Sequence, residues 1–431
     1  AAAVLGTTGT IASGQGDTAA AIAGRAARWS LQNTAKNLLP HEKGLQGCCS
    51  SAAARLAPGG ADPAPRAAVR DVEVWAKDGR TFFKGLQQCG SVWLCPVCSG
   101  KISEKRRAEL QGCVDSALNR AQPMGVTLIT LTVRHGRGDL LADLLSKFSK
   151  AQRRLKSSRA YRCLLADFGI VGEVRALEVT HGRNGWHPHS HAITFSALPI
   201  LDNRASYPRT VEKNARSGLP GRTLGVVQPI ARHRMTQLKR RIFALWFKAC
   251  VAEGLPAPDY LHGVDIRGAK YAAAYAAKWG FSDELTKAMR KKGRDGGRNP
   301  WELLADARAG DRRAAWLFRE YAQHFKGKRQ LFYSKITTAA GAVSLLKHFT
   351  GADEITDQQA LDLSDAVMPP AELVAVLDAD TWACIIKADA RAAVLETARE
   401  GSPALFGLLN CLRVEVGLYG RTLEAREDWE T

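Results

Sequence analysis

Apolar residues recur along the chain in two spacings, one typical of strands and one typical of helices. Residues 126–133 are dense in β-branched side chains, and residues 171–180 and 186–195 predict two more strands joined by a short turn. Residues 140–156 instead place apolar side chains at helical spacing, with basic residues on the opposite face. The first half of the pattern therefore predicts a strand, an amphipathic helix and a β-hairpin.

The second half of the chain continues with alternating elements. Residues 235–251 predict a helix with a basic face, residues 262–267 a strand, and residues 269–279 an alanine-rich helix. Helices are also expected over residues 300–326 and, in an acidic segment, after residue 346. This order predicts an α+β fold with a central antiparallel sheet and flanking helices.

The chain is long enough for more than one unit, and we expect four segments. Residues 1–70 are rich in alanine and glycine, and are expected to be mostly flexible with one short helix near residues 27–38. Residues 71–120 are expected to form a cysteine knuckle followed by a helix. Residues 121–340 hold the predicted sheet, and residues 341–431 are expected to form an acidic helical C-terminal domain.

Charge is distributed unevenly. The whole chain carries a formal net charge of +19, but residues 351–431 carry −10 and the remainder +29. A body this basic favours a polyanionic partner such as DNA, because each neutralised phosphate releases counterions. The alternative is a soluble basic protein with no nucleic-acid role, which charge alone does not exclude.

Targeting signals are not evident in the sequence. No run approaches the ~18 apolar residues that a membrane span needs, and the start lacks the basic region and apolar core of a signal peptide. We therefore expect a cytoplasmic location.

The most informative local pattern is His187-Pro188-His189-Ser190-His191. Alternate side chains of a strand point to the same face, so the three histidines share one face. The alternative is a surface strand with scattered histidines, but three at strict period two disfavour it. His187 is the weakest candidate ligand, because Pro188 limits backbone pairing there.

A carboxylate is expected beside these histidines. The Asn184-Gly185 pair favours a tight turn, and folding about it sets Arg183 opposite Trp186 and Glu178 opposite His191. Two imidazoles and a carboxylate form an open site for a divalent cation. His189, His191 and Glu178 are therefore the predicted ligands of Mg²⁺ or Mn²⁺. Nitrogen ligands also allow Zn²⁺, and the sequence does not choose among the three ions.

Two tyrosines lie on the alanine-rich helix. Tyr271 and Tyr275 are spaced i, i+4, and Lys278 follows Tyr275 at i+3, so the three share one face. A phenol becomes a useful nucleophile when a cation or polarised phosphate is near, and its attack on DNA would leave a 5′-phosphotyrosine. Taken alone, such a pair is more often ordinary core, and the catalytic interpretation depends on the nearby histidine strand.

A third cluster contains cysteines at metal-ligand spacing. Cys95 and Cys98 form a C-x-x-C unit, and Cys89 is a natural third ligand for structural Zn²⁺. The fourth ligand is expected to be Cys48 or Cys49, with His41 a weaker candidate. The alternative is a set of reduced structural cysteines.

Together these patterns resemble the HUH endonucleases, and most closely the initiators of rolling-circle plasmid replication. Residues 128–135 look like the family's Thr-rich strand, residues 185–191 like its histidine motif, and residues 275–278 like its tyrosine-lysine motif. The resemblance spans most of residues 25–350. It implies that residues 121–340 form an HUH-type nuclease domain.

The resemblance also implies roles. Tyr275 would be the nucleophile, with Tyr271 and Lys278 as further catalytic residues, and the enzyme would nick and rejoin one DNA strand. Two departures stand out. Ser190 lies where the family usually has a bulky apolar residue, and Tyr271 lies where some relatives carry a glutamate that activates water, which suggests a second strand transfer by Tyr271.

Basic clusters are expected to contact the backbone of single-stranded or supercoiled plasmid origin DNA. Without a phosphate-binding G-x-x-x-x-G-K-[ST] motif, strand separation is expected to need a host helicase. The sequence does not predict an oligomeric state. The candidate DNA-binding residues are Arg153, Arg154, Lys156, Lys287, Arg290, Lys291, Lys292 and Arg294.

Two other functions fit the same residues. One is a two-tyrosine HUH transposase of an insertion sequence, which shares the chemistry. The other is a non-enzymatic, zinc-dependent DNA-binding regulator, which would use the cysteines but not the tyrosines.

Overall fold

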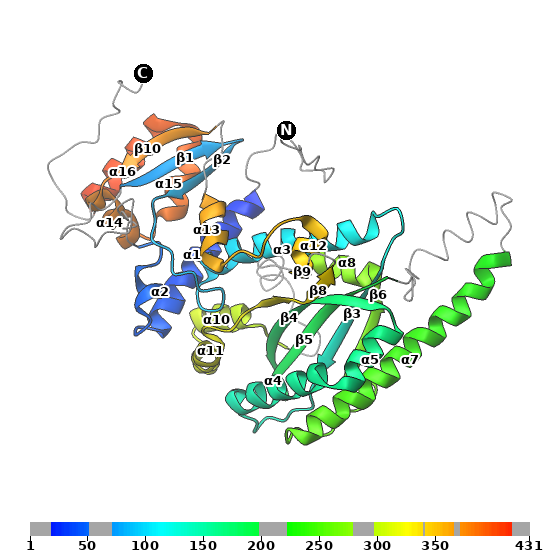
Figure 1. The fold of residues 1–431 in the computed structure, drawn as a ribbon. Helices are drawn as coiled ribbons and strands as arrows, with labels where there is room; N and C mark the ends of the chain where they lie inside the picture. Colours follow the sequence, from blue (N-terminus) through cyan, green and yellow to red (C-terminus); the bar gives the residue numbers. More distant parts are fainter. Residues whose placement is uncertain are drawn as a thin grey trace. The chain divides into compact units, whose positions relative to one another are not determined.

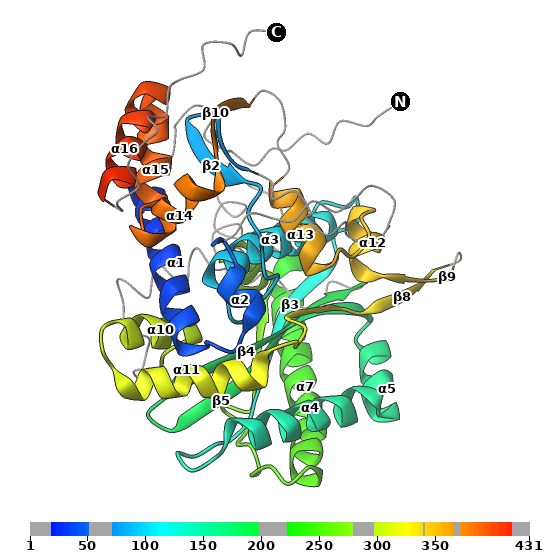
Figure 2. The same ribbon diagram turned by 90° about the vertical axis from the view of Figure 1, so that its left-hand side faces the viewer.

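A computed structural model describes the chain over six ranges, and they form two compact units. One unit comprises residues 99–360, and the other joins residues up to 98 with those from 361 onwards (Figures 1 and 2). The described ranges are 19–50, 71–197, 222–278, 297–338, 341–365 and 371–415.

A five-stranded antiparallel sheet forms the centre of the larger unit. Its strand order is β6-β3-β5-β4-β7. The long hairpin of β4 and β5 lies in the middle of the sheet, where each strand gains a partner on both sides. The strands are β3 (Gly125–Thr132), β4 (Ile170–Gly182), β5 (Gly185–Ser196), β6 (Val264–Gly268) and β7 (Leu331–Tyr333). The predicted α+β fold with a central antiparallel sheet is confirmed.

Three helices cover one face of this sheet: α3 (Pro96–Leu118), α8 (Ala269–Lys278) and α12 (Leu345–Thr350). Alternate strand residues, including Val126, Leu128, Ile193 and Phe195, point into this layer and form one buried core with the helices. The face that carries the histidines is therefore a core face over most of its length.

Another group of helices covers the opposite face: α4 (Leu141–Ser157), α5 (Arg159–Asp167) and α7 (Arg222–Ala252) (Figure 1). Phe148 of α4 and Trp246 of α7 are fully buried with their rings in edge contact, and the Trp246 indole donates to the Thr132 carbonyl at 2.8 Å. Apolar residues at helical spacing on α4 thus form its buried face, as expected of an amphipathic helix, and Lys150, Arg153 and Arg154 are exposed.

The remaining elements of the larger unit come after α8 in the sequence. An Asn299 capping box begins α10 (Pro300–Arg308), and Asp311 caps α11 (Arg312–Phe325). The two-stranded sheet of β8 (Lys335–Thr338) and β9 (Gly341–Ser344) leads into α12, and the larger unit ends within α13 (Asp357–Asp365).

The smaller unit joins both ends of the described chain. Its sheet has the order β10-β1-β2, and buried Arg391 of the C-terminal part donates to the Gln32 side-chain oxygen at 2.9 Å. Its elements are α1 (Ala19–Leu38), α2 (Lys43–Gly47), β1 (Val72–Lys77), β2 (Arg80–Lys84), β10 (Glu372–Leu377), α14 (Ala379–Lys387), α15 (Arg391–Thr397), η2 (Ala398–Glu400) and α16 (Ser402–Glu415).

The two observed units do not coincide with the four segments expected from the sequence. β10 pairs with β1, so the acidic C-terminal segment includes a strand and shares a core with residues of α1, β1 and β2. This pairing joins strands about 300 residues apart, and the pattern within either segment cannot indicate it. Among the described residues, no helix is both long enough and apolar enough to span a bilayer.

We expect Phe195→Ala to lower the free energy of unfolding of the larger unit by about 3–5 kcal/mol. Phe195 is fully buried in the core and its ring lies 4.7 Å from that of Phe349. Urea unfolding measures the change, and Val171→Ala on the same sheet is the control, because Val171 is 38% exposed. Equal stability of the two variants would contradict this core.

Candidate functional site

The β4–β5 hairpin brings the predicted carboxylate to the histidines, but in a different register from that expected. Gly182 pairs with Gly185, so Glu178 lies opposite His189 rather than His191. Arg183 and Asn184 form the turn, and Gly185 takes a positive φ of 89°. The expected register was wrong by two residues, because the turn lies one residue earlier than the Asn184-Gly185 pair. A shift of two keeps every side chain on its face, so Glu178 still faces the histidines.

One carboxylate oxygen of Glu178 faces two imidazoles. Glu178 Oε2 lies 3.3 Å from His189 Nε2 and 3.5 Å from His191 Nε2. Ligands about 2.1 Å from a cation lie roughly 3.0–3.4 Å apart around it, so these spacings suit one divalent ion. Glu178, His189 and His191 form one of two groups in the described chain whose ligand atoms are close enough to share a metal.

The other ring nitrogens are occupied by hydrogen bonds that orient the imidazoles. His191 Nδ1 lies 2.9 Å from the Thr130 hydroxyl, and His189 Nδ1 lies 3.1 Å from the His187 carbonyl. Such partners fix the tautomer of a histidine and leave its other nitrogen for a metal. The Nε2 atoms are therefore the ones presented to Glu178.

The protonation states of these residues favour binding of a cation. Burial disfavours the ionised form of Glu178, but the charge of His191 and the hydrogen bond from His189 outweigh it and lower the pKa of Glu178 to about 2. Burial lowers the pKa of His191, although Glu178 opposes that shift. At neutral pH the site therefore offers an ionised carboxylate and a neutral His191.

Tyr275 reaches the same carboxylate from α8. Its hydroxyl donates to Glu178 Oε1 at 2.6 Å, and its ring lies 4.9 Å from that of His191. Ala272 and Ala276, on the adjoining face of α8, are fully buried against the sheet. Because alanine is small, the helix lies close enough to the strands for a phenol to reach the histidines.

Other predicted groups lie elsewhere. Tyr271 is 50% exposed, and its ring lies 5.0 Å from the Arg267 guanidinium rather than in the histidine group. Lys278 ends α8, and its side chain lies outside the described part. His187 is outside the three-residue group, with its ring 4.8 Å from that of His135 and 5.1 Å from that of His189.

Sequence reasoning missed two residues on the neighbouring strands. Thr130 pairs with His191 on one side and with Asp265 on the other. Asp265 therefore shares the face of the histidines, and its charge favours protonation of His191. The pairing of β3 between β5 and β6 places these groups, and only knowledge of the strand order could have identified them.

The second group consists of four thiols in the smaller unit. Cys48 Sγ lies 3.7 Å from Cys95 Sγ and 3.5 Å from Cys98 Sγ, and Cys89 Sγ lies 3.7 Å from Cys98 Sγ. Sulfurs about 2.3 Å from a tetrahedral zinc ion lie ~3.8 Å apart. These four thiols could hold a metal ion such as zinc.

Their surroundings suit a bound cation. Neighbouring thiols and burial raise the pKa of Cys48 and Cys89, so thiolates there need a compensating charge. The Cys98 amide and the Gln32 side chain point toward Cys95 Sγ at 3.5 and 3.3 Å. Such donors stabilise a metal-bound thiolate.

One of the candidates for a fourth ligand lies beside the other three thiols. Cys48 belongs to the group, whereas Cys49 lies outside it with its sulfur 3.8 Å from that of Cys48. His41 is exposed and is not part of the group.

The candidate DNA-binding residues differ in their surroundings. Arg154 forms an ion pair with Glu253 at 2.6 Å. Lys156 forms an ion pair with Glu173 in which both side chains are mostly buried. Arg153 is exposed and lines a pocket. The second cluster lies outside the described residues: Lys287, Arg290, Lys291, Lys292 and Arg294.

Comparison with known proteins points to replication. A family model described as Replication protein matches residues 82–199. That range contains Glu178, the histidine strand and three of the four clustered cysteines, but ends before α8. This part of the chain is therefore similar to replication proteins.

Curated relatives extend this similarity. The chain is 32% identical over 271 residues to a Protein rep of Streptomyces lividans, covering 54% of this chain and 55% of that protein. It is 35% identical over 140 residues to a Neomycin resistance protein of Streptomyces cyanogenus, covering 27% and 32% of the two chains. It is 32% identical over 114 residues to a Protein rep of Bacillus sp, covering 26% and 34%. The chain thus spans about half of the first relative and about a third of the others, and no solved structure matches.

We expect Cys48→Ser to lose tightly bound zinc, because its thiol completes the four-sulfur group. Cys49→Ser is the matched control and should keep the wild-type zinc content, measured by elemental analysis after dialysis. Retention by Cys48→Ser together with loss by Cys49→Ser would reverse the assignment of the fourth ligand.

We expect Glu178→Gln to weaken Mn²⁺ binding at least about tenfold, because loss of even an outer hydrogen-bond partner typically costs ~10–100-fold. Titration calorimetry on zinc-loaded protein measures the change. Asp167→Asn removes a carboxylate that meets Arg241 in an exposed ion pair, and should bind Mn²⁺ like the wild type. Unchanged affinity in Glu178→Gln would remove the carboxylate from the metal site.

Proposed function

We propose that this chain is an initiator of rolling-circle plasmid replication that nicks and rejoins one DNA strand through Tyr275. The observation that carries the proposal is the hydrogen bond from the Tyr275 hydroxyl to Glu178 Oε1 at 2.6 Å, made while Glu178 Oε2 faces His189 and His191. One carboxylate thus links a phenol to a cation-binding group. A phenol directed to a polarised phosphate is the arrangement that phosphotyrosine chemistry needs.

The reaction can be written so that its bonds and protons balance. The Tyr275 oxygen attacks the scissile phosphorus, the bond from phosphorus to the 3′-oxygen breaks, and a 5′-phosphotyrosine remains. The phenol gives up one proton and the leaving 3′-oxygen gains one. Glu178 orients the phenolic hydrogen before the attack. At the end of a round Tyr271 would make a second strand transfer, and a free 3′-hydroxyl would then attack the 5′-phosphotyrosine, rejoin the strand and release the phenol.

Glu178, His189 and His191 would hold Mg²⁺ or Mn²⁺, and the fit rests on their ligand spacing and ionisation. When bound, the cation draws charge from the phosphate oxygens and makes attack easier. Thr130 holds His191 in the orientation that this requires. We place Zn²⁺ at the four cysteines, where it would stabilise the smaller unit rather than take part in the reaction.

The substrate and partners follow from charge and similarity. The relatives named Protein rep and the match to replication proteins favour a replication origin as the DNA target. The basic body of the chain suits single-stranded or supercoiled DNA. A host helicase would separate the strands after the nick.

We expect Tyr275→Phe to reduce nicking and covalent adduct formation by at least about a thousandfold, because it removes the nucleophile and keeps the ring. Supercoiled plasmid carrying the replicon, with Mn²⁺ and analysis on a denaturing gel, measures both products. Tyr271→Phe is the matched comparison on the same helix. It should still nick, and we expect it to fail in rejoining.

Several results would count against the proposal. Normal nicking by Tyr275→Phe would overturn the assignment of the nucleophile. Absence of both nick and adduct with wild-type protein would favour a DNA-binding regulator without enzymatic activity.

A further inference from the structure

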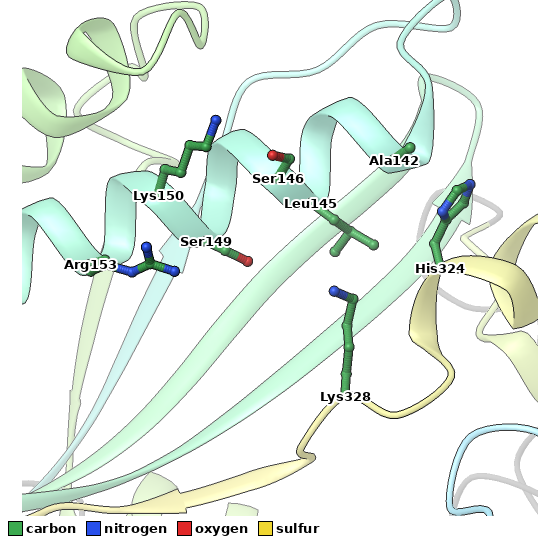
Figure 3. Close-up of a pocket in the computed structure, with 8 residues that line it drawn as sticks. All are labelled: Ala142, Leu145, Ser146, Ser149, Lys150, Arg153, His324 and Lys328. Carbon is green, nitrogen blue, oxygen red and sulfur yellow. The ribbon is translucent and has the colours of Figure 1, made fainter.

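A polar pocket lies between α4 and the end of α11 in the larger unit (Figure 3). It encloses about 290 Å³. One wall is a single face of α4, and the other is formed by His324 and Lys328 at and just after the C-terminus of α11. The α4 residues are Ala142, Leu145, Ser146, Ser149, Lys150 and Arg153.

The lining has the chemistry of an anion site. Lys150, Arg153 and Lys328 supply three cations, and Ser146 and Ser149 supply hydroxyl donors between them (Figure 3). None of the eight lining residues is acidic. The Lys328 amine points toward α4, whereas the Lys150 amine extends along the far edge of the pocket, away from Lys328 (Figure 3). A lining of cations and hydroxyls without a carboxylate favours phosphate oxygens as the ligand.

Other cations of α4 are arranged differently. Lys147 pairs with Asp143 at 2.7 Å, and Arg154 pairs with Glu253 at 2.6 Å. These charges are matched by carboxylates within the chain. The positive charge of α4 is therefore concentrated along the face that lines the pocket.

Size and composition argue for part of a polymer. The volume lies at the lower limit of the ~300–1,000 Å³ typical of small-molecule pockets. No tyrosine, tryptophan or phenylalanine lines it, and the His324 imidazole is the one ring among its eight lining residues. The lining therefore offers more to a phosphate backbone than to stacked bases. Ala142 and Arg153 are separated by roughly 16 Å of helix, a groove length that exceeds one phosphate group.

We propose that this pocket binds the sugar-phosphate backbone of a DNA strand, independently of sequence, as it passes the nicking site. The inference rests on the proposed function for the identity of the strand. α4 covers the sheet face opposite the histidines, and the chain enters it from β3, whose Thr132 pairs with His189. A strand leaving the histidine group can therefore cross the end of the sheet and continue along α4.

The test measures single-stranded DNA binding against salt. We expect Lys150→Ala to reduce the slope of log Kobs against log salt by about 0.7, the value for one phosphate contact on a single strand. The Lys150→Ala/Arg153→Ala double variant should reduce it by about 1.4. Lys147→Ala is the matched control, because it removes one cation from the same helix outside the pocket, and its slope should equal the wild type.

A second variant separates a loss of DNA binding from a loss of folding. Ala142→Glu places a carboxylate in the pocket near the N-terminus of α4, where negative charge stabilises a helix. We expect it to unfold at a temperature no lower than the wild type, yet to bind random-sequence single strands about tenfold more weakly.

The outcomes separate this inference from the proposed function. A reduced slope in the double variant with no covalent adduct in any variant would support the pocket while contradicting the nuclease. Wild-type salt slopes in the pocket variants, with Tyr275-dependent nicking intact, would contradict DNA binding at the pocket but not the proposed nicking activity. Binding of a free nucleotide or inorganic phosphate that single-stranded DNA cannot displace would also overturn it.

Discussion

The carboxylate of Glu178 joins the two parts of the candidate site. One oxygen faces the imidazoles of His189 and His191, and the other accepts the Tyr275 hydroxyl. Strand β4 holds the carboxylate, strand β5 the imidazoles and helix α8 the phenol. If this single group were displaced, the candidate metal group would lose the one carboxylate among its three described members, and Tyr275 would lose its hydrogen bond to Oε1.

Backbone pairing and small side chains make this contact possible. The hairpin lies in the middle of the sheet, so pairing on both sides fixes its register and the positions of Glu178 and His189. The buried alanines Ala272 and Ala276 let α8 lie close to the strands. Beyond the histidines, side chains on the same sheet face form a packed core that includes Phe195. This core holds in place the strands that carry the site.

Local patterns in the sequence predicted the strands and helices that carry the histidines and tyrosines, and most of the candidate ligands, but not the strands after residue 330. Strand alternation indicated that His189 and His191 share a face, and a register error of two residues did not change the conclusion for Glu178, because strand faces repeat every second residue. Helical spacing indicated that Tyr271 and Tyr275 share a face of α8, and the structure brings Tyr275 to Glu178. Cysteine spacing identified the C-x-x-C unit.

Contacts between distant segments could not be predicted in this way. Thr130 and Asp265 join the site only because β3 lies between β5 and β6. The choice of Cys48 over Cys49 depends on how residues near α2 fold back onto the knuckle. Tyr271 shares a helix face with Tyr275, yet it is half exposed beside Arg267, because one helical turn carries it away from the histidine group.

The most direct test of the central claim is to identify the residue that becomes linked to DNA. Trypsin cleavage after Lys270 and Lys278 releases a peptide of residues 271–278 that contains both tyrosines, and its fragment ions assign the nucleotide to one of them. We predict that the initial nick leaves the nucleotide on Tyr275. A nucleotide found on Tyr271 alone, or on a peptide outside α8, would contradict it.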